Sequence, residues 1–315
     1  MGGALDPVVA TGRNLVRHAL DDLGPAARIV IGVSGGADSL ALAAVTAFVA
    51  DRAALDVEAV VVDHQLQPGS AEVAEVAVKQ LAGIGLPARV VRVEVGADGG
   101  PEGAARTARL GALGATGADA VLLAHTLDDQ AETVLLGLGR GSGPRSIAGM
   151  SAHDGLWRRP FLRLRRADTE HICRVHGLTW WTDPHNSDPA FRRSRLRAEV
   201  MPLLEDVLGG GVAEALARTA EQVRHDGLVL DALAAEVAAP HDVDTLAALP
   251  VAVRSRVLRL AALAAGAEAL TATHVSELDR LVTDWRGQRR VELPGGVSAT
   301  RTGASLSFAD TPVKR

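Results

Sequence analysis

A glycine-rich turn follows the first apolar run of the chain and is the segment best suited to bind an anion. Its residues are Ser34, Gly35, Gly36, Ala37, Asp38 and Ser39. Adjacent glycines let backbone N–H groups approach an anion, the serine hydroxyls add donors, and the following helix adds the positive end of its dipole. Asp38 would repel a phosphate unless Mg²⁺ lay between them, and the lysine of the common nucleotide-binding loop is absent. The turn therefore suits a magnesium-bound pyrophosphate group. The alternative is a simple tight turn between a strand and a helix.

A second candidate site contains one histidine and three acids. His125, Asp129 and Glu132 are spaced by four and three residues, so a helix would place them on one face. With Asp128 they supply three acids in five residues, which could bind Mg²⁺ or an ammonium group. The alternative is that Asp128 and Asp129 only begin a helix, where acids interact favourably with the dipole.

Two further pairs of residues could serve the same chemistry. Arg106 and Arg109 are expected on one face of a helix, where two guanidinium groups suit the charge that develops on an α-phosphate under attack. A solvent-facing arginine pair is the alternative. Asp63 and His64 end an apolar run, and for His64 a structural role is as consistent with the sequence as ligand binding.

Arginine is concentrated in one segment of an otherwise acidic chain. The net charge is −5, but residues 158–197 contain ten arginines against four acids, a local charge of +6. Such a segment is a candidate surface for an anionic polymer, with Arg193, Arg195 and Arg197 as the contacts. The alternative is that these arginines are structural and pair with acids such as Asp183 and Asp188.

Apolar runs and helical stretches alternate through the first half of the chain. Strands are predicted at residues 28–33, 57–63, 88–95 and 120–124, and helices at 39–51, 71–84, 102–117 and 128–138. This alternation predicts an α/β fold, a parallel sheet with helices on both faces. Ligands of such sheets bind at the carboxyl ends of the strands, which is where the glycine-rich turn, Asp63, His64 and His125 fall.

The rest of the chain is predicted to form a smaller, mainly helical domain. We place the first domain, with its arginine-rich extension, at residues 1–208 and the second at residues 212–315, separated by three glycines. Helical periodicity covers residues 212–239, 246–265 and 273–285, and residues 290–293 and 304–308 could pair as a hairpin.

Composition excludes several classes of protein. A chain of 315 residues with 47% apolar residues is long and apolar enough to be globular rather than disordered. No apolar run reaches the length of a bilayer span, and residues 1–17 lack a signal-like apolar core. The single cysteine, Cys173, excludes an internal disulfide and a multi-cysteine zinc site. We therefore expect a cytoplasmic protein with no membrane partner.

The ordered motifs resemble the PP-loop ATP-pyrophosphatase superfamily and, within it, the tRNA(Ile)-lysidine synthetase family. Residues 34–39 are similar to the PP-loop, residues 63–70 to Asp-His-x-Leu-Arg-x-x-Ser, and residues 102–109 to Glu-x-x-Ala-Arg-x-x-Arg. Residues 125–133 are similar to His-x-x-Asp-Asp-Gln-x-Glu-Thr, residues 140–143 to Arg-Gly-x-Gly, and residues 183–202 to the segment before the helical domain. Gln67, Thr126 and Ser194 depart from the pattern. Longer members carry a further C-terminal domain, which we do not expect here. A series of motifs in order is more specific than any one alone.

The resemblance implies a tRNA-modifying ligase. ATP would adenylate the C2 oxygen of the wobble cytosine of tRNA(Ile) with a CAU anticodon, the ε-amine of free L-lysine would attack C2, and the products would be lysidine, AMP and pyrophosphate. Implied catalytic residues are Asp38, Arg106, Arg109, His125, Asp129 and Glu132; ATP would bind residues 34–39, Asp63 and His64, Mg²⁺ would bind Asp38 and Asp128, and tRNA would bind Arg193, Arg195 and Arg197. Asp129 and Glu132 are the candidates for binding and deprotonating the lysine amine.

Two other functions stay open at this point, as does a homodimer. A PP-loop enzyme that thiolates tRNA would commonly need paired cysteines or an iron–sulfur cluster, which one cysteine cannot supply. A non-catalytic nucleotide-binding module would not need the acids at residues 128–132.

Overall fold

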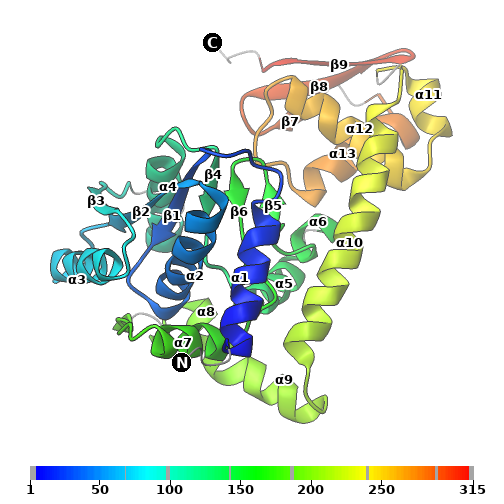
Figure 1. Cartoon of the computed structure of the whole chain (residues 1–315). Coiled ribbons are helices and arrows are strands. Elements are labelled where there is room, and N and C mark those ends of the chain that lie inside the picture. Colours follow the sequence, from blue (N-terminus) through cyan, green and yellow to red (C-terminus); the bar gives the residue numbers. More distant parts are fainter. Residues whose placement is uncertain are drawn as a thin grey trace. The chain divides into compact units, whose positions relative to one another are not determined.

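The computed structural model describes residues 5–67, 69–96, 100–141, 143–184, 188–238, 241–287 and 290–311, except for the side chains of residues 101 and 102 (Figure 1). The chain forms two compact units. The first contains residues 1–133 and 150–217, and the second contains residues 134–149 and 218–315. Among the described helices, none combines the length and apolar character that a bilayer span requires.

The first unit is built on a six-stranded sheet with the strand order β3-β2-β1-β4-β6-β5. The strands are β1 (Arg28–Val33), β2 (Asp56–Asp63), β3 (Ala88–Arg92), β4 (Ala120–Leu122), β5 (His153–Asp154) and β6 (Trp157–Arg158). All pairs are parallel except β5 with β6. The predicted parallel α/β sheet is confirmed. β5 and β6 were missed because two-residue strands leave no apolar run to recognise.

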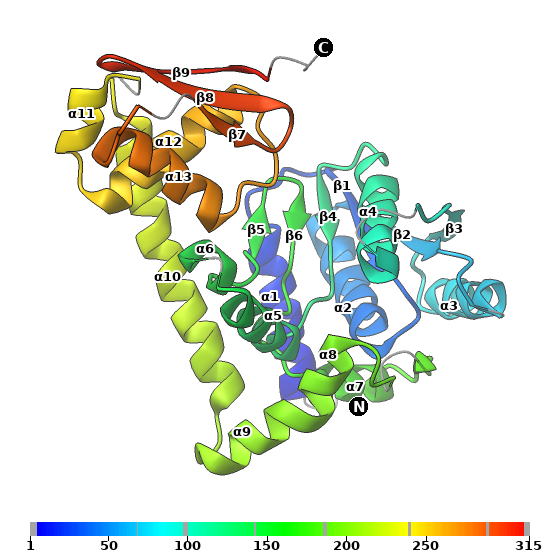
Figure 2. The same cartoon turned by 180° about the vertical axis from the view of Figure 1, so that it is seen from behind.

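Helices cover both faces of this sheet (Figures 1 and 2). They include α1 (Pro7–Ala19), α2 (Ala37–Ala53), α3 (Ser70–Gly83), α4 (Gly100–Gly114), α5 (Leu127–Arg140) and α7 (Arg166–Val175). Ile29 and Ile31 of β1 pack in one core with α1, α2, α3 and α7, whereas Val30 packs in a second core with Leu113 of α4. Because both of their faces are buried, the central strands β1 and β4 are largely apolar without alternation. Helix α1, which begins at the capping residue Asp6, was not predicted.

A second helical segment follows α7 in the first unit. It comprises α8 (Arg192–Arg195), a π-helical turn η2 (Leu196–Val200) and α9 (Met201–Val207), which follow one another without a break. The predicted glycine linker lies between α9 and α10 (Val212–Ala235).

The second unit packs helices against a small antiparallel sheet. Its further elements are α6 (Pro144–Ile147), α11 (Val243–Ala248), α12 (Val251–Ala264), α13 (Ala272–Thr283), β7 (Val291–Leu293), β8 (Val297–Thr302) and β9 (Ser305–Asp310). The predicted hairpin is wrong in its pairing. Both β7 and β9 pair with β8, a strand whose polar sequence hid it. The helix predicted at residues 246–265 is two helices, because Leu249 before Pro250 is extended.

Two glycines of α5 provide a test of packing in the second unit. Gly137 is buried, and a Cβ there would overlap the carbonyl oxygen of Ser146, whereas a Cβ at the exposed Gly139 would meet no atom within 4 Å. We expect Gly137→Ala to destabilise the protein by about 2 kcal/mol or more, because backbone must move. Gly139→Ala should stabilise it by about 0.5–1 kcal/mol. Thermal melting of both variants checks this, and equal shifts would contradict the assigned close approach.

Candidate functional site

The glycine-rich turn is held in shape by its own last residue. Gly35 has a φ of +80°, which favours glycine, and a Cβ there would lie 3.3 Å from Val73 of α3. The Ser39 hydroxyl accepts a hydrogen bond from the Ser34 N–H (3.1 Å) and donates one to the Gly36 carbonyl (2.9 Å). The Ser39 hydroxyl therefore stabilises the loop itself. Helix α2 begins at Ala37, and its first backbone N–H groups make no hydrogen bonds within the helix.

Asp38 is held between two side chains of α7. Its Oδ1 accepts a hydrogen bond from the Thr169 hydroxyl (2.5 Å), and its Oδ2 lies 3.6 Å from Nε of Arg166. Burial raises the pKa of Asp38 to about 6, although the Thr169 hydrogen bond and the Arg166 charge act in the opposite direction.

The two adjacent acids at the start of α5 have different partners. Asp129 accepts hydrogen bonds at Oδ2 from the N–H and hydroxyl of Thr126 (2.8 and 3.0 Å), while its Oδ1 lies 3.1 Å from Arg166. Burial alone would raise the pKa of Asp129, but Arg166 and Thr126 outweigh burial and lower it. Asp128 instead accepts from the Arg166 N–H (2.8 Å) and the Arg165 guanidinium (3.1 Å). Both oxygens of Asp128 are thus occupied by α7, which does not support the expected Mg²⁺ ligand.

Glu132 is a buried carboxylate with an arginine as its counter-ion. Its side chain is 1% exposed, and Arg197 of η2 donates to both its oxygens, from Nε (2.9 Å) and from a terminal nitrogen (3.3 Å). Burial raises the pKa of Glu132 despite this pairing. Arg197 also lies 3.8 Å from Asp129.

Asp38, Asp129, Glu132, Arg166 and Arg197 together form what we call the acid–arginine cluster. Beside it lies a cavity of about 190 Å³, lined by Asp128, Glu132, Arg165, Arg166, Arg197, Met201, Pro202 and Glu205. Within the described part of the chain, no three His, Cys, Asp or Glu residues are arranged to hold a metal ion.

Unpaired nitrogens mark a second, positively charged region, which we call the anion region. Among the described residues, Nδ1 of His64, Nδ1 of His125 and Nε of Arg109 are buried without a hydrogen-bond partner. Burial, followed by the charges of Arg106 and Arg193, lowers the pKa of Arg109. Burial also lowers the pKa of His64, and that of His125 to about 3, with Arg109 adding to both shifts. Neutral imidazoles beside a guanidinium suit an incoming phosphate.

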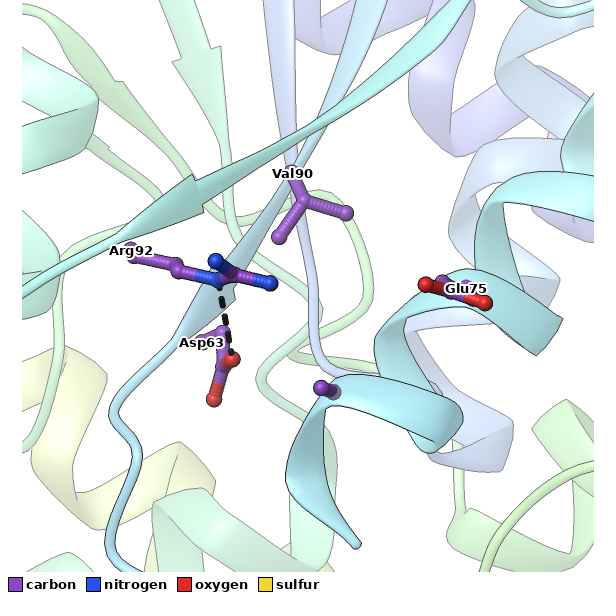
Figure 3. Close-up of a pocket in the computed structure, with 5 residues that line it drawn as sticks. Asp63, Glu75, Val90 and Arg92 are labelled. Carbon is purple, nitrogen blue, oxygen red and sulfur yellow. Dashed lines mark ion pairs between the residues drawn. The ribbon is translucent and has the colours of Figure 1, made fainter.

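Asp63 lies at a hollow formed by the carboxyl ends of β2 and β3 (Figure 3). The cavity has a volume of about 460 Å³ and is lined by Asp63, Ala71, Glu75, Val90 and Arg92. Asp63 lies 3.9 Å from Arg92 at Oδ2 and accepts from the Gln65 N–H (2.9 Å) at Oδ1. This second contact fixes the turn that presents His64.

The three arginines expected to bind tRNA lie in different environments. Arg195 is 59% exposed at its side chain and pairs with Glu199 at 2.8 Å. Arg193 is close enough to Arg109 to lower its pKa, and Arg197 belongs to the acid–arginine cluster. Arg195 and Arg197 thus pair with Glu199 and Glu132 rather than with Asp183 or Asp188.

The sequence analysis missed α7 as part of the site. Arg165 and Arg166 were counted only within the basic segment, and Thr169 was not considered. One signal could have identified them. The Asp168 side chain accepts a hydrogen bond from the Arg165 N–H (2.9 Å) at the start of a helix, shortly after the parallel strand β6, and helices begin at the ligand edge of such sheets.

Comparisons with known proteins agree with this geometry. The PP-loop domain model matches residues 11–204, and the TilS substrate binding domain model matches residues 242–305. The chain is 53% identical over 302 residues to a tRNA(Ile)-lysidine synthase of Leifsonia xyli, covering 91% of each chain. It is 55% identical over 300 residues to that of Nocardia farcinica, covering 93% of each chain.

A solved structure shares the fold at low sequence identity. A U34-tRNA thiolase from Methanococcus maripaludis, determined with its iron–sulfur cluster, superimposes with a TM-score of 0.58. The match is 18% identical and covers 69% of this chain and 80% of the thiolase. At that identity the likeness shows the fold alone.

Because its pKa is raised, we expect Asp38 to lower the free energy of unfolding at neutral pH. Its pKa rises from 3.8 to about 6 on folding, so the protein loses stability as the pH increases from about 4 to about 6. We expect Asp38→Asn to be more stable than the natural protein at pH 7.5, by up to about 3 kcal/mol. The difference should vanish near pH 4. Thermal melts of both proteins across this range check it, and a difference independent of pH would contradict the assigned burial effect.

Proposed function

The chain belongs to the tRNA(Ile)-lysidine synthase family, and on that premise we propose how its site joins L-lysine to tRNA(Ile). The protein is a tRNA-modifying ligase that uses ATP. The reaction attaches lysine to C2 of the wobble cytidine in the CAU anticodon and yields lysidine, AMP and pyrophosphate. One observation supports the mechanism. The acid–arginine cluster, which has more acids than arginines, lies beside the positively charged anion region at the ligand edge of one sheet.

The glycine-rich turn and the anion region would bind the phosphates of ATP. Support comes from the three buried nitrogens without partners and from the free N–H groups at the start of α2. Asp38 is the residue that would hold Mg²⁺ there, and a single carboxylate is enough because Mg²⁺ takes its other ligands from phosphates and water. Bound Mg²⁺ would neutralise charge on the pyrophosphate leaving group. We assign Asp128 to fixing the start of α7.

The nucleoside end of ATP would occupy the cavity at β2 and β3. The volume of about 460 Å³ suits a nucleoside, and Asp63 and Glu75 offer acceptors for ribose hydroxyls (Figure 3). Helix α3 borders both the cavity and the turn, since it carries Ala71 and Glu75, and its Val73 would lie 3.3 Å from a Cβ at Gly35.

Arg106 and Arg109 would stabilise the α-phosphate when the C2 oxygen of cytosine attacks it. The unpaired Nε of Arg109 supports this role, because a guanidinium fixed before the reaction need not reorganise. His125, with its pKa lowered to about 3, is neutral at physiological pH and would act as a hydrogen-bonding group rather than as a charge.

The acid–arginine cluster would bind the ε-ammonium group of lysine. In the absence of lysine Arg197 pairs with Glu132, and the substrate ammonium would take this place as an equivalent cation. Only the neutral amine is a nucleophile, so a carboxylate must remove a proton before C2 is attacked and AMP leaves. The raised pKa of Glu132 makes it a stronger base than an ordinary carboxylate, with Asp129 beside it.

Contacts with tRNA would come from Arg193, Arg195 and the second unit. Arg195 is exposed, and residues 242–305 match the substrate binding domain model.

The thiolase alternative is not favoured. The single Cys173 is buried and its thiol hydrogen bonds to the Ala37 carbonyl, so no cysteine is available to bind a cluster.

A product assay tests the function directly. The protein would be incubated with total tRNA, ATP and labelled lysine, and the digested tRNA would be searched for a lysine-bearing nucleoside. Labelled lysidine is the expected result. A stable complex with unconsumed ATP would instead support a binding module.

Glu132→Gln should impair lysine transfer more than adenylation, because the amide keeps the shape of the side chain but not the charge that attracts an ammonium. ATP–pyrophosphate exchange with tRNA reports the first step, and lysidine formation reports both. Glu199→Gln is the matched control, since Glu199 pairs with Arg195 through the same two-point geometry but lies at the surface. Equal loss in both half-reactions would assign Glu132 to a structural role.

Arg195 and Arg197 should differ in their effect on tRNA binding. Arg195→Gln should reduce the slope of log affinity against log salt by about one unit, because one phosphate contact is lost. Arg197→Gln should leave that slope unchanged and lower the KM for lysine, because the cation that competes with the ammonium group for Glu132 is removed. Binding titrations at several salt concentrations check this, and an unchanged slope for Arg195→Gln would favour the second unit as the main tRNA surface.

A further inference from the structure

Helix α7 contacts the start of α2 through two buried polar side chains. Thr169 and Cys173 are one helical turn apart, and neither is exposed. The Thr169 hydroxyl bonds to Asp38 (2.5 Å), and the Cys173 thiol bonds to the Ala37 carbonyl (3.3 Å). Burial raises the pKa of Cys173 to about 12, so the thiol remains protonated and donates. Two adjacent residues of α2 are therefore held by one face of α7.

The Thr169 hydroxyl has two acceptors for one hydrogen. The Arg166 carbonyl lies 2.7 Å away, and the Asp38 carboxylate lies 2.5 Å away. A carboxylate is the stronger acceptor, so the hydrogen points to Asp38. Because Oδ2 of Asp38 faces the Arg166 guanidinium at 3.6 Å, each oxygen has its own partner on α7.

Packing alone does not explain a hydroxyl at this position. Thr169 is fully buried, and a valine would fill the same volume without any polar atom. A buried hydroxyl is unfavourable unless it is hydrogen-bonded, and here the bond goes to the acid of the phosphate loop. The hydroxyl is therefore best explained by what it does to Asp38.

We infer that Thr169 is a positioning residue for the adenylation step, an inference that rests on the proposed role of Asp38 at the magnesium–pyrophosphate group. Its hydroxyl holds Oδ1 and so prevents the carboxylate from turning both oxygens toward Arg166. Without the hydroxyl, Arg166 would be the remaining partner of Asp38 among the described residues. Arg166 also binds Asp129 on α5. Asp38 would then be drawn away from the phosphates.

The test compares three variants in lysine-independent ATP–pyrophosphate exchange with tRNA. Thr169→Val should lower kcat/KM by about 10- to 100-fold and raise the magnesium concentration for half-maximal rate, as expected for a lost hydrogen bond to a charge. Thr169→Ser keeps the hydroxyl and should stay within about threefold of the natural protein. Cys173→Ala removes the other α7–α2 hydrogen bond without touching Asp38, and it should retain exchange.

Three outcomes would overturn the inference. These are normal exchange in folded Thr169→Val, equal losses in Thr169→Val and Cys173→Ala, or no recovery in Thr169→Ser. If Thr169→Val does not fold, Thr169→Ser against Thr169→Ala makes the same comparison, because both lack the methyl group and only serine keeps the hydroxyl. Calorimetric binding of magnesium–ATP to the same variants should show weaker binding for Thr169→Val. Magnesium–ATP binding still tests the role of Thr169 if the natural protein forms no lysidine. A failure of the inference can therefore be distinguished from a failure of the proposed function.

Discussion

Three carboxylates converge in a largely buried volume, and the local structure depends on offsetting their repulsion. Asp38 comes from α2, and Asp129 and Glu132 come from α5, while Arg166 and Arg197 supply the counter-charges. Breaking such pairs leaves an uncompensated buried charge, which is strongly destabilising. The segments that carry the two arginines must therefore be placed as accurately as those that carry the acids.

Local structure positions each of the two arginines, Arg166 and Arg197. Asp128 caps the start of α7 and so fixes the helix from which Arg166 extends. Arg197 lies in the π-helical turn η2, and π-turns commonly occur at functional sites. Within one segment, Arg195 pairs locally with Glu199 while Arg197 reaches Glu132, 65 residues away in the sequence. A surface pair and a buried pair thus arise two residues apart.

The sequence predicted the elements that depend on local patterns and missed the contacts that depend on tertiary structure. The apolar strands, the turn at residues 34–39 and the helix that carries Asp129 and Glu132 were recognisable because each lies within a few residues. His125 precedes that helix, so the prediction that it shares a helical face with the two acids is wrong. The bond from Thr169 to Asp38 joins residues 131 apart, and the pair Arg166–Asp129 joins residues 37 apart. No periodicity encodes such pairs. Strand β8 was missed for another reason, since its polar residues conceal it.

Charge balance links the two halves of the site to the two small substrates. Three acids face two arginines in the acid–arginine cluster, and with Asp38 assigned to Mg²⁺ the other two acids are balanced by Arg166 and Arg197. The neighbouring anion region is positively charged, and among the described residues Nε of Arg109 and Nδ1 of His64 and of His125 are buried there without a hydrogen-bond partner. In the proposed mechanism, an ammonium group would replace Arg197 at Glu132 in the first region, and a phosphate would bind in the second. The two regions adjoin through Asp129, whose charge acts on both His125 and Arg166. In the proposed mechanism, the lysine amine and the adenylated cytosine would meet there without an unpaired charge being buried.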